Sequence, residues 1–229
     1  MSEHIVSRRT ASRRCCRNIA FFGARGTFGS RILTEALDRG YRITAVLQSP
    51  GDLAVSHPNL TVTTGDVLDP ASVAAVAQGK DAVVSAIGGR QDGNAHAVLL
   101  RIAAESLIEG LRLLGTDAPR FVSVGCAGSP DTPGPPDPAT PRGQGTPPGH
   151  GQGAVLDYLV TVSDVRWTHF SPAARTESGS RTGTFRLTLD DLARGPEGGT
   201  LIDAEDYAVA LVDELDDPDH AHQRFHARH

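Results

Sequence analysis

The residue pattern with the clearest chemistry is a set of three glycines separated by two residues each, Gly23-Ala24-Arg25-Gly26-Thr27-Phe28-Gly29. It follows an apolar run, Asn18–Phe22, that predicts a buried strand, and it opens a stretch with helical apolar spacing, Thr27–Arg39. In such a turn the first glycine permits the sharp reversal, the second lets a pyrophosphate approach, and the third allows close helix packing. The helix N-terminus offers amides and partial positive charge to phosphates. The pattern therefore predicts a dinucleotide site.

The choice between NAD(H) and NADP(H) depends on the residues that end the second predicted strand, Arg42–Leu47. An acidic residue there binds the ribose 2′-hydroxyl of NAD(H), whereas arginine suits the 2′-phosphate of NADP(H). This chain has Gln48 followed by Ser49, which supplies neither signal. Arg25 could contact a 2′-phosphate from the glycine turn, or it could be a solvated surface side chain. We slightly favour NADP(H) over NAD(H).

Strands and helices alternate along most of the chain after this turn. Repeated strand–helix–strand units imply a parallel sheet with right-handed crossovers and helices on both faces. We therefore predict an α/β doubly wound (Rossmann) fold. The further strands are expected at Arg42–Leu47, Leu60–Thr64, Asp81–Ala86, Arg120–Gly125 and Arg166–Ser171, and the further helices at 70–77 behind an Asp69 N-cap, His96–Leu114, Ala154–Val162 and from an Asp203 cap to about Leu215.

Four segments stand apart from this alternation. Residues 1–17 form a basic arm that is expected to be disordered, and residues 18–229 are expected to form one domain. Glycine and proline dominate an insert at 128–153, which predicts a mobile lid or a disordered loop without a helix. A small substrate-side region is expected from about residue 172. The tail His220–His229 is polar and is expected to be irregular.

Several motifs in order along the chain resemble the NmrA-like, NAD(P)H-binding group of atypical short-chain dehydrogenases/reductases. Besides the glycine spacing, the resemblance rests on Thr64–Val67, Asp81–Gly88, Ser123–Gly128, Phe170–Ala174 and Asp203–Ala208, and it covers residues 18–226 outside the insert. The resemblance implies that Asp66 and Val67 flank the adenine. It also implies that the ribose and pyrophosphate lie along Ala86, Ile87 and Gly88, and that the nicotinamide is bordered by Gly125, Ser171, Pro172 and Ala173.

The tyrosine–lysine pair of ordinary short-chain dehydrogenases is absent from this chain. Val162 stands four residues after Tyr158, and the sole lysine, Lys80, precedes a different strand. The chain is also similar to the small biliverdin and flavin reductases through its sixth strand and a hairpin-like stretch at Arg181–Phe185. That resemblance implies direct hydride donation by the cofactor, assisted by a serine after strand five, at or beside Cys126 here.

Four residues are candidates for a catalytic role near the expected nicotinamide, and each has a structural alternative. Cys126 could be a buried small residue, because free cysteines usually lie inert in the core. Ser123, within the fifth strand, and Tyr158, on the helix after the insert, could simply pack against neighbours. His169 lies in the sixth strand, where its alternation with Ser171 is compatible with either face of the sheet.

Composition excludes some function classes. The net charge of −5 is mild, so we expect neither nucleic acid nor a membrane surface as a partner, and no apolar run approaches the about 18 residues of a membrane span. The odd set of Cys15, Cys16 and Cys126 favours a reducing cytoplasm over a disulfide framework. The tail histidines lack a fixed scaffold, so no metal site is expected.

The leading hypothesis is a cytoplasmic NAD(P)H-dependent reductase, monomeric or homodimeric, that acts on a conjugated or aromatic carbonyl-like small molecule. An apolar pocket at the strand ends, with the insert as a lid, would orient that substrate and exclude water. One alternative is a redox-neutral lyase, isomerase or cyclase of a biosynthetic pathway on the same fold. The other is a non-catalytic NAD(P)-sensing regulator that binds a protein partner.

Overall fold

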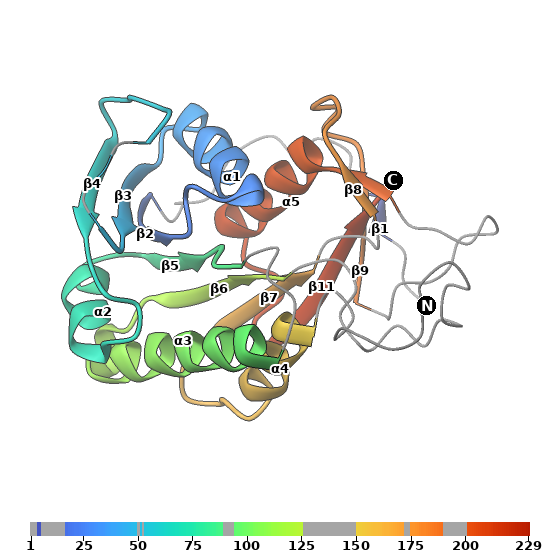
Figure 1. Cartoon of the computed structure of the whole chain (residues 1–229). Coiled ribbons are helices and arrows are strands. Elements are labelled where there is room, and N and C mark those ends of the chain that lie inside the picture. The colour runs from blue at the N-terminus through green and yellow to red at the C-terminus, as the bar shows by residue number, and fades with distance from the viewer. Residues whose placement is uncertain are drawn as a thin grey trace.

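The computed structural model describes residues 4–5, 17–49, 51, 53–88, 94–125, 150–171, 175–189 and 201–229. One large sheet runs through the described part of the chain, with helices packed on both of its faces (Figure 1). Helices α1 (Thr27–Asp38) and α5 (Ala204–Asp216) pack together on one face. Helices α2 (Pro70–Ala77), α3 (Asn94–Arg112) and α4 (His150–Leu159) cover the other.

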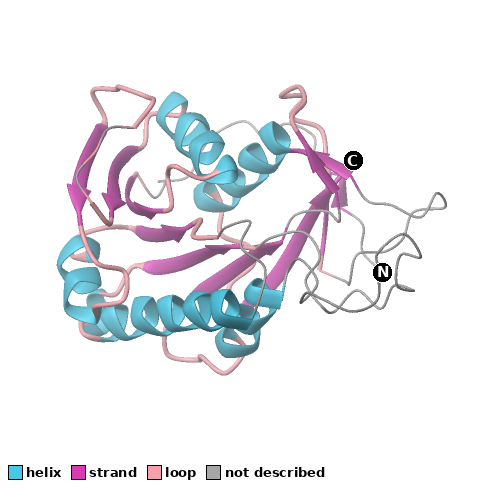
Figure 2. Ribbon diagram, in the orientation of Figure 1, coloured by secondary structure: helices cyan, strands magenta, loops and turns pink. Residues whose placement is uncertain are grey.

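The strands are short and most of them run in the same direction (Figure 2). Their bounds are β1 His4–Ile5, β2 Asn18–Phe22, β3 Arg42–Leu47, β4 Leu60–Thr64, β5 Ala82–Ser85, β6 Arg120–Val124, β7 Trp167–Ser171, β8 Arg175–Glu177, β9 Arg186–Thr188, β10 Leu201–Asp203 and β11 Gln223–Arg228. A single 3-10 turn, Gly115–Asp117, precedes β6 in the described residues.

The strand order in the large sheet is β1-β9-β11-β7-β6-β5-β2-β3-β4. All pairs from β4 across to β11 are parallel, and β9 and β1 add antiparallel pairs at one edge. The chain builds outward from β2 to β4 and then crosses to β5 on the other side of β2. This reversal is the topological switch point where doubly wound proteins bind ligands. The predicted Rossmann fold is confirmed.

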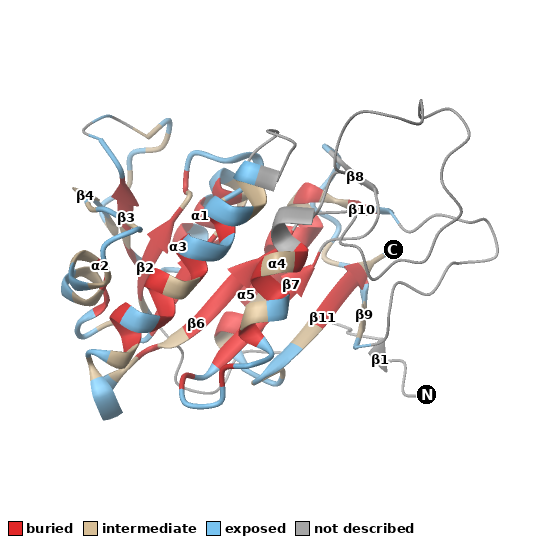
Figure 3. Cartoon of the chain, turned by 60° about the horizontal axis from the view of Figure 1, so that its bottom comes forward, coloured by how far each residue is buried: buried red, intermediate tan, exposed pale blue. Residues whose placement is uncertain are grey.

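The core consists of two apolar layers, one on each face of the sheet (Figure 3). Successive side chains of a strand point to opposite faces. Phe21, Val84 and Val122 therefore pack toward α1 and α5, while Val83 and Phe121 pack toward α2, α3 and α4. Full burial of such a side chain contributes about 1.5–3 kcal/mol each. The two layers fix the strands whose carboxyl ends carry the candidate site.

The polar tail is not irregular, contrary to the expectation from its composition. Residues 223–228 form β11, which lies between β7 and β9 in the sheet. The ring of Phe225 stacks on Phe170 with centroids 4.3 Å apart, and Phe170 stacks in turn on Tyr207 at 4.2 Å. A strand with only two inward apolar residues is stabilised by partners that are distant in the sequence. Propensity reasoning therefore missed it.

Three smaller expectations also change. Helix α4 begins at His150, so the last four residues of the predicted insert are helical. His4–Ile5, inside the arm expected to be disordered, pair with β9 as β1. The stretch Arg181–Phe185 has no strand of its own; it is a loop that turns at Gly183, where φ is +65°. None of the helices in the described ranges has the length and apolar character that a membrane crossing requires.

Candidate active site

Two of the three glycines in the turn after β2 are required by the packing of the protein itself. Gly23 has φ +83°, and a Cβ there would lie 2.5 Å from the carbonyl carbon and oxygen of Ala86, which follows β5. A Cβ on Gly29 would collide with the carbonyl oxygen of Gly23. The loop ends of β2 and β5 and the first turn of α1 therefore meet more closely than any side chain allows.

Gly26 differs from the other two glycines because a side chain there would make a tight contact but no severe collision. Its φ of −68° and ψ of 163° suit any residue, and a Cβ would lie 3.3 Å from the nearest atom, the carbonyl oxygen of Gly23. Gly26 is exposed, is the N-cap of α1, and supplies no side-chain cap. No side chain at Gly26 therefore covers the first-turn amides of α1, and these amides could bind a pyrophosphate.

The other residues of the turn have separate roles. The side chain of Ala24 is buried in the core, so it can contact a nucleotide only through its backbone. Phe28 is half-buried and packs on the Tyr207 ring with centroids 4.8 Å apart. Thr27 is exposed, and its carbonyl oxygen accepts a 2.8 Å hydrogen bond from Arg31 Nη1. Arg31 also pairs with Glu205 of α5 at 2.8 Å, which anchors the start of α1.

The guanidinium of Arg25 lies across the loop that follows β3. A Cβ on Gly51 in that loop would collide with Arg25 Nη2. Gln48, at the beginning of the same loop, is exposed. The positive charge therefore lies at the carboxyl end of β3, where doubly wound proteins contact the adenosine ribose.

The remaining predicted nucleotide contacts lie after β4 and β5 at the same edge of the sheet. Asp66 is exposed, and its Oδ1 accepts a 2.9 Å hydrogen bond from the Leu68 amide, so its side chain shapes a turn. Val67 is half-buried against the layer under α2 and α3. Ile87 and Gly88 continue from β5, next to Gly23. Pro172 and Cys126 lie outside the described residues.

A row of polar side chains crosses the carboxyl ends of β5, β6 and β7. Ser85 is the register partner of Ser123, and Ser123 is the partner of His169. All three are buried, and alternation places them on the face covered by α2, α3 and α4. Ser171, two residues beyond His169, faces the same way and is 2% exposed. The structure thus brings two of the predicted catalytic residues, Ser123 and His169, together.

The two histidines of this region are neutral. Burial, together with the charge of Arg224 and the proximity of the His226 ring, lowers the pKa of His169 to about 3. Burial and Arg224 lower the pKa of His226 to about 4. His226 Nε2 accepts a 2.8 Å hydrogen bond from Arg224 Nε, so the ring proton of neutral His226 is on Nδ1.

Tyr158 does not join this group. It lies near the C-terminus of α4, which runs from the carboxyl edge of the sheet back to the amino edge. Its neighbour is Arg112 at the end of α3, whose guanidinium pairs with Asp164 just before β7 at 2.7 Å. Burial raises the pKa of the Tyr158 phenol. The helix direction therefore places this tyrosine away from the glycine turn.

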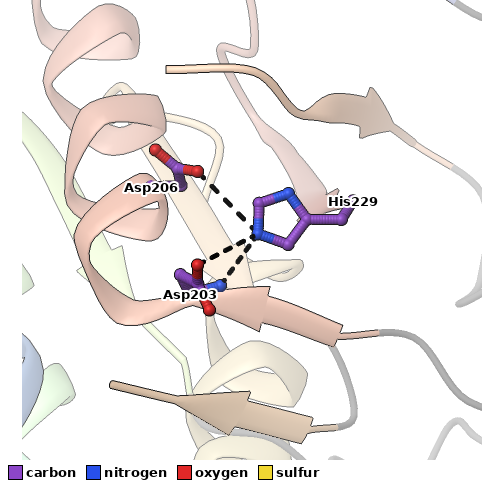
Figure 4. A group of neighbouring side chains, drawn as sticks. All are labelled: Asp203, Asp206 and His229. Carbon is purple, nitrogen blue, oxygen red and sulfur yellow. Dashed lines mark hydrogen bonds and ion pairs between the residues drawn. The ribbon is translucent and has the colours of Figure 1, made fainter. Parts of the chain in front are cut away.

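Sequence reasoning missed a cluster formed by Asp203, Asp206 and His229 (Figure 4). The tail brings His229 to the first turn of α5, where its Nε2 accepts the Asp203 amide at 3.2 Å. Asp203 is the N-cap as predicted, but its carboxylate makes no cap bond and accepts the Ser180 amide at 3.2 Å instead. Asp206 is fully buried and accepts the amides of Thr182 and Gly183 at 2.8 and 2.7 Å. These atoms are engaged within the protein.

A second buried carboxylate holds the same loop from the side of α1. Glu35 accepts two 2.7 Å hydrogen bonds from Arg181 and one of 2.8 Å from Arg39. Burial alone would raise the pKa of Glu35, but the hydrogen bonds from Arg181 and Arg39 outweigh it and lower that pKa. The loop at 178–184 is thus fixed to α1 and α5, the two helices beside the glycine turn. The sequence signal that could have revealed the Asp203, Asp206 and His229 cluster was the run of acidic residues in Asp203–Asp206.

The strand order, the glycine turn at the reversal and the uncapped helix N-terminus define a dinucleotide-binding Rossmann domain. The sequence profile of the NAD(P)H-binding family matches residues 23–218, and the chain belongs to this family. It is 31% identical to the uncharacterized protein YwnB of Bacillus subtilis over 90% of this chain and 96% of that protein.

Two solved structures are similar over nearly the whole chain. A putative epimerase from Bacteroides thetaiotaomicron is 32% identical, with a TM-score of 0.78 over 93% of this chain and 97% of that one. A putative NADH-flavin reductase from Streptococcus pneumoniae is 27% identical, with a TM-score of 0.71 over 93% of this chain and 99% of that one.

Proposed function

We propose that the protein is an NAD(P)H-dependent reductase that acts on a conjugated or aromatic carbonyl-like small molecule. The observation that supports this most is Gly26, an exposed glycine at an uncapped helix N-terminus that the packing constrains less than Gly23 and Gly29. The polar row on β5, β6 and β7 lies at the same edge of the sheet. Similarity to a putative NADH-flavin reductase agrees with this assignment.

The residues at this edge fit a nicotinamide dinucleotide. The first-turn amides of α1 would bind the pyrophosphate, while Gly23 and Gly29 hold those amides in place. Gly125, at the end of β6, would border the nicotinamide. When bound, NAD(P)H would supply the hydride, and the protein would orient the acceptor and exclude water.

We further propose that NADP(H) is preferred, because Arg25 brings its charge to the loop after β3. An Arg25→Ala protein is expected to lose about tenfold in NADPH affinity while its NADH affinity stays within twofold. Arg166→Ala removes an exposed arginine at the opposite edge of the sheet and is the matched control. Equal effects on both nucleotides, measured by calorimetric titration, would contradict the preference.

Nucleotide binding is tested by titrating the purified protein with NADPH and NADH. Gly26→Glu places a carboxylate where the phosphates would lie, so affinity for both is expected to fall at least tenfold, with a smaller loss of stability than a substitution at Gly23 or Gly29 would cause. Thr34→Glu adds the same charge on the exposed side of α1 and is expected to bind normally. No heat with either nucleotide in the parent protein would refute the proposal.

Turnover is tested with menadione, flavin mononucleotide and a cyclic enone as acceptors. The expected result is loss of the reduced nicotinamide absorbance with at least one acceptor. Bound nucleotide without oxidation by any acceptor would favour a second candidate, a reaction with no net redox change. Similarity to a putative epimerase and the remote position of Tyr158 favour that candidate.

A further inference from the structure

Several buried polar atoms of β7 have no hydrogen-bond partner among the residues that the structure describes. They are both ring nitrogens of His169 and Oγ of Ser171. The two side chains are 0% and 2% exposed, so bulk water does not hydrogen-bond to them. Leaving such a group unpaired costs about 1–3 kcal/mol. Unpaired atoms gathered in one place therefore indicate a ligand or an ordered water.

Two of these atoms converge on Gly125. A Cβ at this position would lie 2.9 Å from His169 Nε2 and 3.1 Å from Ser171 Oγ. The φ of Gly125 is not in the left-handed region, so its backbone conformation does not require a glycine. The missing side chain instead lets an imidazole and a hydroxyl pack directly against the backbone of Gly125, at the carboxyl end of β6, where a substrate is expected.

We propose that His169 and Ser171, which both pack against the backbone of Gly125, form the subsite that binds the carbonyl oxygen of the substrate. This inference rests on the proposed reductase function and names the contact that the substrate makes. Ser123, the neighbour of His169 on β6, lies in the same row. The polar groups thus come from two adjacent strands that the core holds rigidly.

The chemistry matches the groups that are present. The hydride forms a C–H bond at the acceptor carbon, the π electron pair of the carbonyl moves to oxygen, and a proton from solvent completes the hydroxyl. NAD(P)H is oxidised to NAD(P)⁺. Negative charge develops on the oxygen, and preorganised N–H and O–H donors in a water-poor site stabilise it. A neutral imidazole can serve as such a donor, and His169 is neutral at physiological pH.

The test compares His169→Leu, His169→Gln and Ser171→Ala with the parent protein. His169→Leu is expected to lower kcat for menadione about a hundredfold. The dissociation constant of NADPH is expected to stay within twofold, and thermal stability should not fall, because an unpaired polar group is removed. His169→Gln keeps an N–H donor and should recover part of the loss. Thr168→Val, on the opposite face of β7, is the matched control and should leave turnover unchanged.

A second readout does not depend on turnover. In protein with isotope-labelled histidine, the ring nitrogen signals of His169 are expected to shift when menadione is added to the NADP⁺ complex. Unchanged signals, or parental turnover in His169→Leu with intact NADPH binding, would overturn the inference and leave an internal water as the partner. Failure of the parent protein to bind either nucleotide would instead refute the proposed function.

Discussion

The two faces of the sheet treat buried polar groups in opposite ways. On the face of α1 and α5, Asp206 and Glu35 each accept several hydrogen bonds. On the other face, His169 and Ser171 are also buried, but they have atoms without a hydrogen-bond partner in the described part of the chain. Paired buried charges hold a structure together, whereas unpaired groups cost stability. The comparison separates the part of the protein that positions the site from the part that we expect to meet the substrate.

The paired side gives the glycine turn its rigidity. The loop at 178–184 is fixed by carboxylates of α1 and α5, and Arg31 joins that loop to the start of α1 through Ser178 and Glu205. An anion site built from helix amides requires those amides to stay in place. Substitutions on the paired side should therefore act mainly on stability, and those on the unpaired side mainly on turnover.

The largest effect is expected from Asp206→Ala. This change leaves the amides of Thr182 and Gly183 without their acceptor and removes a fully buried charge from its donors. We expect a loss of about 3–5 kcal/mol in the free energy of unfolding, measured by urea denaturation. Asp38→Ala, an exposed carboxylate at the end of α1, should change it by less than about 0.5 kcal/mol. Similar losses in both variants would contradict the distinction.

The pH dependence of the free energy of unfolding should reflect the two buried histidines, His169 and His226. The pKa values of His169 and His226 are lowered to about 3 and about 4, below the ordinary value of 6.5. Below pH 6.5 the unfolded chain therefore binds protons that the folded protein does not. Stability is expected to fall as pH drops from 6.5 toward 4.5, by up to about 1.4 kcal/mol per unit for each histidine.

Between pH 6.5 and 4.5, the effect of the two histidines on stability can be separated from that of Glu35. The pKa of Glu35 is lowered from 4.5, so its contribution is present above that pH and is lost only as pH falls further. His169→Leu should remove about half of the slope between pH 6.5 and 4.5 in urea titrations. An unchanged slope would show that His169 gains a proton in the folded state near its ordinary pKa.

The smallest effect is expected from added metal. Asp203, Asp206 and His229 offer ligand atoms within 4.8 Å of one another, a spacing compatible with a cation. Those atoms already accept or share hydrogen bonds with the loop and the backbone. Zinc or calcium should shift the melting temperature by less than about 1 °C, because binding would displace these bonds. A clear rise in melting temperature with one ion would show instead that this cluster binds a metal.

Local sequence signals predicted the parallel sheet and several helix boundaries. The Asp69-Pro70 start of α2 is confirmed, since Asp69 accepts the Ala71 amide at 3.0 Å. The glycine turn also lies where the alternation placed it, between β2 and α1. These features depend on residues within a few positions of one another, which is why a single sequence sufficed.

Features that depend on distant partners were not predictable in the same way. Asp203 was assigned as a cap, but the acceptor role of its side chain is set by a loop more than twenty residues earlier. The strand β11 needs β7 and β9 to receive it. His169 was a candidate from its residue type, while its lack of hydrogen-bond partners in the described ranges emerges only when the surrounding strands are assembled.

The position of Trp167 has a consequence for spectroscopy. This residue is the sole tryptophan, and it begins β7, at the edge of the sheet away from the glycine turn. Its Nε1 donates to the Val162 carbonyl at 2.9 Å, and its ring lies nearly perpendicular to the His222 ring, with centroids 5.9 Å apart. The intrinsic emission of the protein should therefore report how the chain before β11 joins β7. Local detachment of that final strand would be visible as a red shift before the nucleotide edge unfolds.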